Sequence, residues 1–186
     1  MKNKPNLVYA VFAALASLLL AGVAVYVGIT VFQNNPGLAI MDFILALMVV
    51  LGCVFLEIGE FKAGKDIRLL GCLLGYLAIV ILLFTQGNST KSPFAIIAGI
   101  GLFAYTVFTI LNIYLSQKGL VIVSFVFAAI CFLLLLGQGI YTMVNETYTL
   151  TSVLYFFGYF FLGIALFIGS LFHLIDLNKN DEATKA

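Results

Sequence analysis

Charged side chains are scarce in this sequence: only 9% of its 186 residues are Asp, Glu, Lys or Arg, whereas 63% are hydrophobic. A soluble domain has about a quarter charged residues and roughly half apolar ones. The chain therefore cannot cover itself with polar surface, and lipid must be its main solvent. The net charge of +1 and the lack of a Lys/Arg-rich run exclude the electrostatic attraction on which nucleic-acid binding depends.

Residue types that hold metals or carry catalysis are also scarce. The single histidine excludes bis-histidine haem ligation and most zinc sites. The cysteines Cys53, Cys72 and Cys131 form no C-x-x-C motif, and we interpret them as buried structural thiols. The sequence contains neither a G-x-S-x-G motif nor a phosphate-binding loop. We therefore predict that the protein is not an enzyme and binds no cofactor and no metal.

Long apolar runs, in contrast, are abundant. A membrane-spanning helix needs about 20 mostly apolar residues. The sequence contains six such stretches, at about 7–32, 38–60, 67–86, 93–116, 120–144 and 149–175. These runs are longer than strands and lack alternation of apolar and polar residues. We predict an all-α, polytopic transmembrane six-helix bundle that forms one domain over residues 1–186, with residues 177–186 as a short cytoplasmic tail.

The placement of basic residues predicts the orientation of the chain. Alternate ends of the spans hold most of the basic side chains, and the opposite side holds only Lys91. The residues on the basic side are Lys2, Lys4, Lys62, Lys65, Arg68, Lys118, Lys179 and Lys185. The positive-inside rule then places both termini in the cytoplasm, for a multi-pass protein of the cell membrane.

One stretch concentrates charge: residues 56–71 read LEIGEFKAGKDIRLLG. Within it, EFKAGKDIR (60–68) is predicted to be the cytoplasmic connection between the second and third spans. Its mixed charges at short spacing favour a solvated turn with local ion pairs, each contributing at most about 1 kcal/mol. The alternative interpretation is a loop that docks a partner or gates a path.

The odd-numbered spans share a pattern of small residues at positions i, i+4 and i+7. These positions are Ser17, Ala21 and Ala24 in the first span, Gly71, Gly75 and Ala78 in the third, and Ser124, Ala128 and Cys131 in the fifth. Each odd span leads to an outer turn and a returning even span. We therefore predict three tandem helical hairpins, at about 7–60, 67–116 and 120–175, in a pseudo-threefold arrangement.

Small residues let helices approach closely inside a membrane. We therefore expect the odd spans to turn their small faces inward, with the bulkier even spans outside. The longest stripe belongs to the first span: Ala10, Ala14, Ser17, Ala21, Ala24 and Gly28.

Two families share parts of this pattern. Glycine-punctuated hairpins with outer turns such as NNPG (34–37), and above all residues 127–174 (FAAICFLLLLGQGIYTMVNETYTLTSVLYFFGYFFLGIALFIGSLFHL), resemble the HdeD-type small membrane proteins. That family has six spans and internal hairpin repeats, and the resemblance implies a role in stress tolerance. Glu57 and Glu60 at the inner end of the second span depart from it. The segment AVFAA (10–14) also looks like the docking stripe of substrate-binding subunits of energy-coupling-factor vitamin transporters.

Ionisable groups inside a membrane are costly, so each is a candidate site. Asp42, near the outer end of the second span, is a candidate proton or cation acceptor, or simply a charge near a helix start. Glu57, Asn112 and His173 lie near the inner ends of the even spans and would form a polar cluster if the repeat holds. Because an unperturbed histidine titrates at about pH 6.5, such a cluster would be pH-sensitive. Asp176 lies on the helix face of His173.

The alternative is that these polar residues snorkel separately at helix ends. Gln138 lies between two glycines in the fifth span, where the helix could be loosened as at transport sites. A kink near the membrane interface is the other interpretation of Gln138.

Two functional hypotheses follow. The first is a small membrane protein without enzymatic activity, acting in membrane stress tolerance or as an accessory subunit of a membrane assembly. The alternative is a transport component for a small solute or a proton, such as a substrate-binding subunit of a vitamin transporter. Expected partners are the lipid bilayer and a membrane protein or a second copy of the chain, and not nucleic acid.

Overall fold

The computed structural model describes residues 7–62, 64–115, 117–145 and 149–183. Its elements are α1 (Leu7–Val31), α2 (Pro36–Lys62), α3 (Lys65–Gly71), the π-helical turn η1 (Cys72–Tyr76), α4 (Leu77–Thr90), α5 (Pro93–Leu115), α6 (Lys118–Asn145) and α7 (Leu150–Ala183). Because α3, η1 and α4 are continuous, the described residues form six helical spans, each long and apolar enough to cross a membrane. This confirms the prediction of an all-α protein with six spans.

The boundaries of the spans agree with the sequence to within two residues, except at the ends of the third and last spans. The third span continues to Thr90, beyond the predicted end at residue 86. Helix α7 continues to Ala183, so most of the tail expected over residues 177–186 extends the last helix. Residues 184–186 lie outside the described part of the chain.

Local sequence explains where each even span begins. Asn35 Oδ1 accepts a hydrogen bond from the Leu38 N–H (3.2 Å), and Ser92 Oγ accepts one from the Ala95 N–H (3.4 Å). Thr149 Oγ1 caps α7 in the same way, by accepting from the Ser152 N–H at 3.2 Å. These side chains satisfy backbone donors that the first turn of a helix leaves unpaired. Asn35, Ser92 and Thr149 recur at equal intervals in the sequence, which supports the hairpin repeat as an interpretation.

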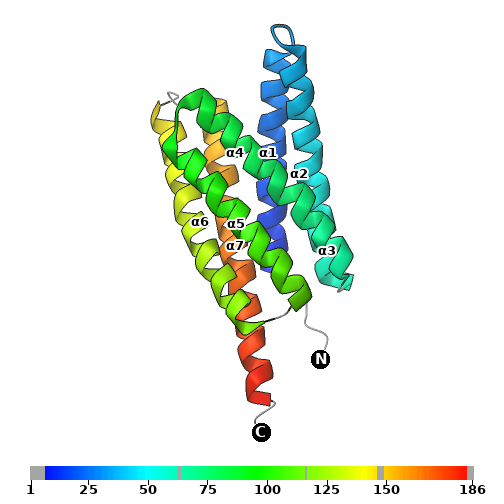
Figure 1. Cartoon of the computed structure of the whole chain (residues 1–186). Helices are drawn as coiled ribbons and strands as arrows, with labels where there is room; N and C mark the ends of the chain where they lie inside the picture. Colours follow the sequence, from blue (N-terminus) through cyan, green and yellow to red (C-terminus); the bar gives the residue numbers. More distant parts are fainter. Residues whose placement is uncertain (1–6, 63, 116, 146–148, 184–186) are drawn as a thin grey trace.

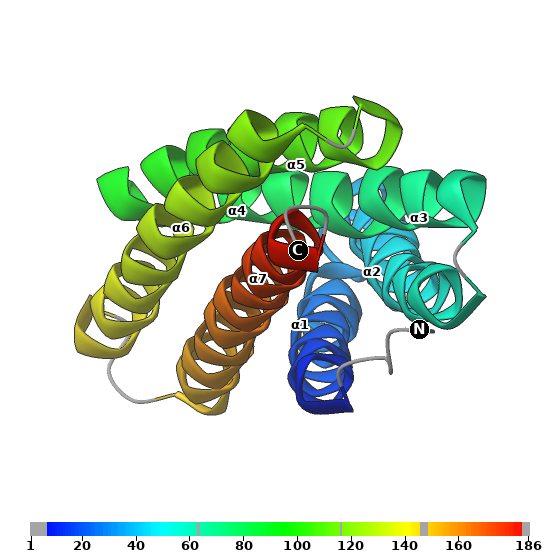
Figure 2. The ribbon, with the colours of Figure 1, turned by 90° about the horizontal axis from the view of Figure 1, so that it is seen from below.

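Each span packs against its neighbours in the sequence, and α7 returns to pack against α1. Figure 1 shows the third span running diagonally across the bundle, with α3 beside α2 and the far end of α4 near the ends of α5 and α6. Seen from below, α6, α7, α1 and α2 lie side by side under α4 and α5 (Figure 2). The diagonal path makes the third span the most enclosed: 50% of its most apolar window is buried, against 33% or less in the others.

The predicted inner ring of odd-numbered spans is wrong. All nine small residues of the repeat are buried: Ser17, Ala21, Ala24, Gly71, Gly75, Ala78, Ser124, Ala128 and Cys131. However, among the described residues the backbones of α1, the third span and α6 do not approach one another closely, and contact between these spans is made by side chains, as between Gln86 of α4 and Thr142 of α6.

The small residues bring an odd span close to the even span before it. A methyl group built on Gly75 would lie 3.3 Å from Gly52 Cα in α2, and one on Gly101 of α5 would lie 3.3 Å from Cys131 Sγ in α6. In α1, Gly28 instead lies against Phe43 and Ala39 of α2, and Ala10 and Ala14 are only half-buried.

The even spans are also part of the core rather than an outer layer. Helix α7 contributes Tyr159, which is completely buried, together with Leu162 and Leu166. Helix α5 contributes Leu102 and Tyr105. Aromatic side chains therefore do not confine a helix to the lipid surface, because one face of α7 packs inward while Phe157 on another face remains 43% exposed.

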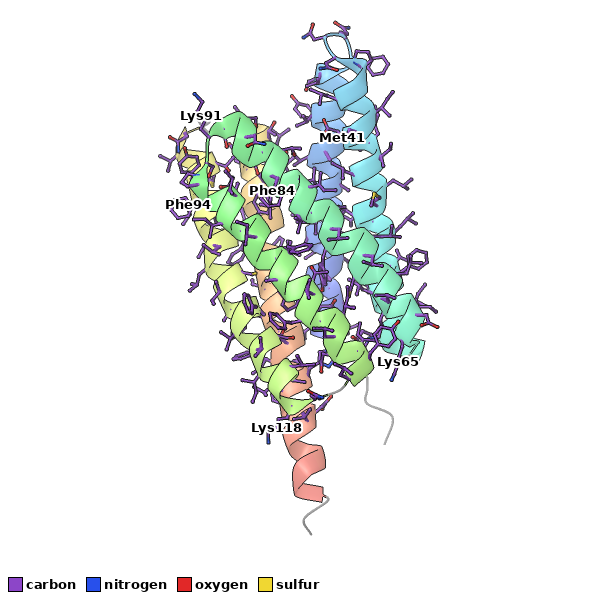
Figure 3. All side chains as sticks on the ribbon, in the orientation of Figure 1. Met41, Lys65, Phe84, Lys91, Phe94 and Lys118 are labelled. Carbon is purple, nitrogen blue, oxygen red and sulfur yellow. The ribbon has the colours of Figure 1, made fainter. Side chains whose placement is uncertain are left out.

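The two ends of the bundle differ in charge. Helix α1 begins and α7 ends at the same end, where Lys65 and Lys118 also lie, whereas Lys91 lies at the opposite end (Figure 3). We call these the inner end and the outer end. The predicted cytoplasmic location of the inner end follows from this charge bias. The terminal residues Lys2, Lys4 and Lys185 lie outside the described residues.

The contact between Gly52 and Gly75 gives a prediction for stability. A methyl group on Gly52 would overlap the backbone of Gly75, whereas one on Gly22 would have no heavy atom within 4 Å. We expect Gly52→Ala to lower the free energy of unfolding by roughly 1–3 kcal/mol, since overpacking forces the backbones apart. Gly22→Ala should leave it unchanged or raise it slightly. Thermal unfolding of both variants in detergent measures the difference, and equal stability would contradict the close-contact interpretation.

Candidate intramembrane site

Three ionisable side chains meet at the inner end of the bundle. Arg68 of α3 forms an ion pair with Glu60 of α2. His173 Nε2 of α7 lies 3.6 Å from Glu60 Oε1 and 3.5 Å from Arg68 Nη2. The side chains are 23% (Arg68), 32% (Glu60) and 48% (His173) exposed, so solvent screens these interactions and each contributes at most about 1 kcal/mol. We call these three residues the inner ion cluster; it joins α2, α3 and α7.

The inner ion cluster differs from the cluster expected from the sequence. Glu57 accepts a long hydrogen bond from the Cys53 thiol of its own helix (3.6 Å). The buried Oδ1 atom of Asn112 has no hydrogen-bond partner among the described residues. In the part of the chain that the structure describes, no hydrogen bond or ion pair joins Glu57, Asn112 and His173.

Sequence reasoning missed Glu60 and Arg68 because it assigned both to a connecting loop. Helix α2 in fact continues through Glu60 to Lys62, and α3 begins at Lys65. The signal was present: Glu60 follows Glu57 by three residues and so shares its helix face.

The other two acidic candidates are not members of this cluster. Asp42 is half-buried in the outer part of α2, and among the described residues it makes no hydrogen bond or ion pair. It shares a helix face with Val49 and Leu56, because seven residues make nearly two turns. Asp176 is half-buried in α7, one turn beyond His173. No group of three His, Cys, Asp or Glu side chains within the described ranges could hold a metal ion.

A small cavity lies in the inner half of the bundle, between α1, α2, the third span and α7. Its volume is about 30 Å³. This suffices for a water molecule but is far below the roughly 300 Å³ of a typical ligand pocket. The lining residues with polar tips are Tyr9, Ser17, Cys53 and Tyr76, and the remaining ones are apolar side chains and Gly75. We call this space the inner cavity.

The π-helical turn shapes one wall of the inner cavity. Such a turn widens the helix by one residue and is frequent at functional sites. It contains Gly75, which touches Gly52, and Tyr76, whose side chain is a hydrogen-bonding partner of Tyr9. The Tyr76 ring also meets that of Tyr105 edge to face, with ring centroids 5.6 Å apart.

The polar layer extends beyond the cavity. The Tyr105 hydroxyl lies 3.2 Å from Ser170 Oγ in α7, within hydrogen-bond distance. Tyr9, Tyr76, Tyr105 and Ser170 thus link α1, the third span, α5 and α7 in one layer of hydroxyl groups. The aromatic and small residue types were visible in the sequence, but their common depth depends on how the helices pack.

A second polar layer lies in the outer half and is completely enclosed. The Tyr159 hydroxyl donates to Gln86 Oε1 (2.5 Å), and Gln86 Nε2 donates to Thr142 Oγ1 (3.4 Å). Gln138 Nε2 donates to the same Thr142 oxygen (3.1 Å), while Ser92 Oγ donates to Gln138 Oε1 (2.6 Å). All five side chains are at most 6% exposed. This outer network joins α4, the start of α5, α6 and α7.

The outer network changes the interpretation of Gln138 and its flanking glycines. Helix α6 is an uninterrupted α-helix through this segment, which does not support the alternative of a loosened helix. A methyl group on Gly139 would lie 2.9 Å from the Phe156 ring, and one on Gly137 would lie 3.3 Å from the Phe94 ring. The glycines therefore admit aromatic rings of α7 and α5, and Gln138 faces polar partners between them.

In comparisons with known proteins, no family model, no curated protein and no solved structure matches the chain. The resemblances to HdeD-type proteins and to vitamin-transporter subunits stay interpretations of the sequence. The six apolar spans nevertheless define the class of the protein, which is a multi-pass integral membrane protein.

The outer network predicts a stability effect at Tyr159. Tyr159→Phe removes the donor to Gln86 Oε1 and leaves a buried carbonyl oxygen without that bond. We expect a loss of about 1 kcal/mol in unfolding free energy, because hydrogen bonds between transmembrane helices contribute about this much. The matched control is Tyr26→Phe, since Tyr26 is 47% exposed. Unfolding curves in mixed micelles compare the two, and an unchanged Tyr159→Phe protein would show that the bond contributes nothing.

Proposed function

We propose that this protein is a non-enzymatic accessory subunit of a membrane assembly. The observation that supports it best is that the interior of the bundle is filled by contacts between its own helices. The polar side chains of the outer half bond to one another between helices, and the inner cavity has room only for a water-sized molecule. The interior thus has the character of a core that fixes the helices. A role in membrane stress tolerance is the physiological setting that the HdeD resemblance implies.

The proposal includes a topology. We place the protein in the cell membrane with both termini in the cytoplasm, because the basic residues gather at the inner end. Apolar side chains are exposed on all six spans, and these surfaces suit contact with lipid or with helices of a partner. One example from each span is Leu18, Leu47, Ile81, Phe103, Leu133 and Phe157.

Gentle release of the protein from its own membrane, followed by native mass spectrometry, tests the accessory role. We expect a complex of defined stoichiometry with another membrane protein or with a second copy of this chain. The control is an unrelated six-span protein of similar expression level, released in the same way. A bound small solute with one protein chain and no protein partner would contradict the accessory role.

The inner half of the bundle favours a second candidate function, a transport component for a proton or a very small solute. Glu57 and the inner ion cluster lie near the inner cavity, and Asp42 lies further out on the α2 face that also carries the cavity-lining Val49 and Leu56. Ionisable groups inside a membrane commonly mark ion and proton pathways. A vitamin-sized ligand is larger than the inner cavity, so this conformation does not favour the vitamin-transporter subunit.

Proton flux into liposomes distinguishes the second candidate from the first. If the protein conducts protons, Asp42→Asn and Glu57→Gln should each reduce the pH change inside reconstituted vesicles, because each removes an ionisable station. Asp66→Asn serves as the control, since Asp66 is exposed at the start of α3. A flux equal to that of protein-free liposomes would exclude proton transport, and of the second candidate only transport of another very small solute would remain.

A further inference from the structure

We infer that helices α5 and α6 form a binding site for a single water molecule in the inner half of the bundle. The side-chain oxygens of Thr109 and Asn112 in α5 and of Ser124 in α6 define this site, which we call the α5–α6 site. It is separate from the inner cavity, which none of these three residues lines. The inference does not depend on the accessory role, because it concerns a ligand of the interior and not the partners of the protein.

Three buried oxygen atoms without partners carry the inference. Thr109 Oγ1, Asn112 Oδ1 and Ser124 Oγ are buried, and none of them has a hydrogen-bond partner among the described residues. Ser124 as a whole is only 6% exposed. Buried polar atoms in proteins are nearly always hydrogen-bonded, because an unpaired one loses its bonds to water without replacement. Three such atoms on two neighbouring helices therefore point to a ligand that supplies the bonds.

The two hydroxyl groups also lack the bond that other Ser and Thr side chains of this bundle make within their own helix. The Thr106 hydroxyl, nearly one turn before Thr109, donates to the Leu102 carbonyl oxygen at 2.7 Å. The hydroxyl of Ser17 bonds in the same way to a carbonyl of the preceding turn. Such a bond satisfies a hydroxyl without any help from a second helix. Thr109 and Ser124 make no such bond, so their hydroxyl groups remain available to a ligand between the helices.

The packing of α5 against α6 brings the two hydroxyl groups to the same depth. A methyl group built on Gly101 would lie 3.3 Å from Cys131 Sγ, so these two residues face each other. Towards the inner end, Thr109 lies two helical turns beyond Gly101 in the sequence, and Ser124 lies two turns from Cys131. Both intervals correspond to about 10–12 Å along the helix axes.

Asn112 and Ser124 lie on the facing sides of the two helices. The Phe108 ring of α5 stacks on the Phe127 ring of α6, with centroids 5.2 Å apart. Asn112 follows Phe108 by one turn and so shares its helix face. Ser124 precedes Cys131 by nearly two turns and so shares the face of α6 that meets Gly101. The amide oxygen and the hydroxyl are thus placed where one small molecule can bridge the two helices.

The α5–α6 site adjoins the inner layer of hydroxyl groups. The Tyr105 hydroxyl lies 3.2 Å from Ser170 Oγ of α7. It also lies near the Thr109 hydroxyl, with which it makes no hydrogen bond of normal geometry. The site therefore extends the layer of hydroxyl groups from α5 and α7 to α6.

The chemistry of the three oxygens selects the ligand. Asn112 Oδ1 can only accept a hydrogen bond, so the ligand must be a donor, whereas the hydroxyls of Thr109 and Ser124 can donate or accept. All three groups are neutral, so they offer an ion no opposite charge to offset its loss of hydration. A buried water molecule typically makes about three hydrogen bonds to polar groups that otherwise lack partners. Water fits this set of oxygens.

Water-edited NMR of the unmodified protein in lipid bilayers tests the site with water itself as the probe. Magnetisation passes from water to isotope-labelled threonine methyl groups, and it passes quickly only where water lies close. We expect the signal of Thr109 to build up several-fold faster than that of Thr106, which lies nearly one turn away and is 1% exposed. Equal rates would overturn the site.

A substitution on the neighbouring helix separates bound water from water at the membrane surface. Ser124→Ala removes one ligand of the proposed water, so it should slow the build-up at Thr109 towards the rate of Thr106. Contact of Thr109 with surface water would not respond to this change. An unchanged rate at Thr109 in the folded Ser124→Ala protein would overturn the shared site, and if the variant does not fold, the comparison in the unmodified protein decides.

The sign of a stability change gives an independent test. If water satisfies the hydroxyl groups, Thr109→Val and Ser124→Ala each remove a hydrogen bond and should raise the equilibrium constant for unfolding in detergent several-fold. If the hydroxyl groups are unpaired, the same substitutions remove a buried polar group that destabilises the fold, and the constant should fall. Thr106→Val is the matched control, because that hydroxyl bonds within its own helix. A constant at or below that of the control would overturn the proposal.

Discussion

The close approach of α2 and the third span at Gly52 and Gly75 is the constraint on which the rest of the structure depends. Two facing glycines let the backbones touch, and no larger residue at Gly52 would permit this. The π-helical turn lies at the same point and contains Gly75 and Tyr76. From this contact the span runs diagonally across the bundle, which carries Gln86 to its partners on α6 and α7 (Figure 1).

The diagonal span organises the interior into two polar layers with an apolar layer between them. Along the third span, Leu83 lies between Tyr76 of the inner layer and Gln86 of the outer network, and along α7, Leu166 lies between Tyr159 and Ser170. Both leucines are completely or almost completely buried. The two layers differ in character, because the outer network is closed on itself whereas the inner layer borders a cavity and an ion cluster. The polar groups of the outer half thus bond to one another and join the helices there.

Much of the fold could be predicted from the sequence, because the lipid bilayer restricts which segments can cross it. Runs of about 20 apolar residues predict spans because the hydrocarbon thickness fixes their length. The helix caps Asn35, Ser92 and Thr149 are of residue types that are preferred at helix starts, although only the structure showed their hydrogen bonds. The arrangement of the spans was not accessible in the same way: small residues indicate that a helix approaches something closely, but they do not identify the neighbour. The inner ring of odd spans failed for this reason.

For the candidate site, too, the sequence predicted properties of single helices but not the contacts between them. The sequence by itself determined that the protein is helical and spans a membrane six times, that its polar residues inside the spans are few, and that the basic residues gather at alternate ends. Only the tertiary structure decided that His173 meets Glu60 and Arg68 rather than Glu57 and Asn112, and that Gln138 belongs to a buried network. The physical reason is that composition and periodicity act within one helix, where lipid sets the requirements, whereas partners across helices depend on the tilt and rotation of each span.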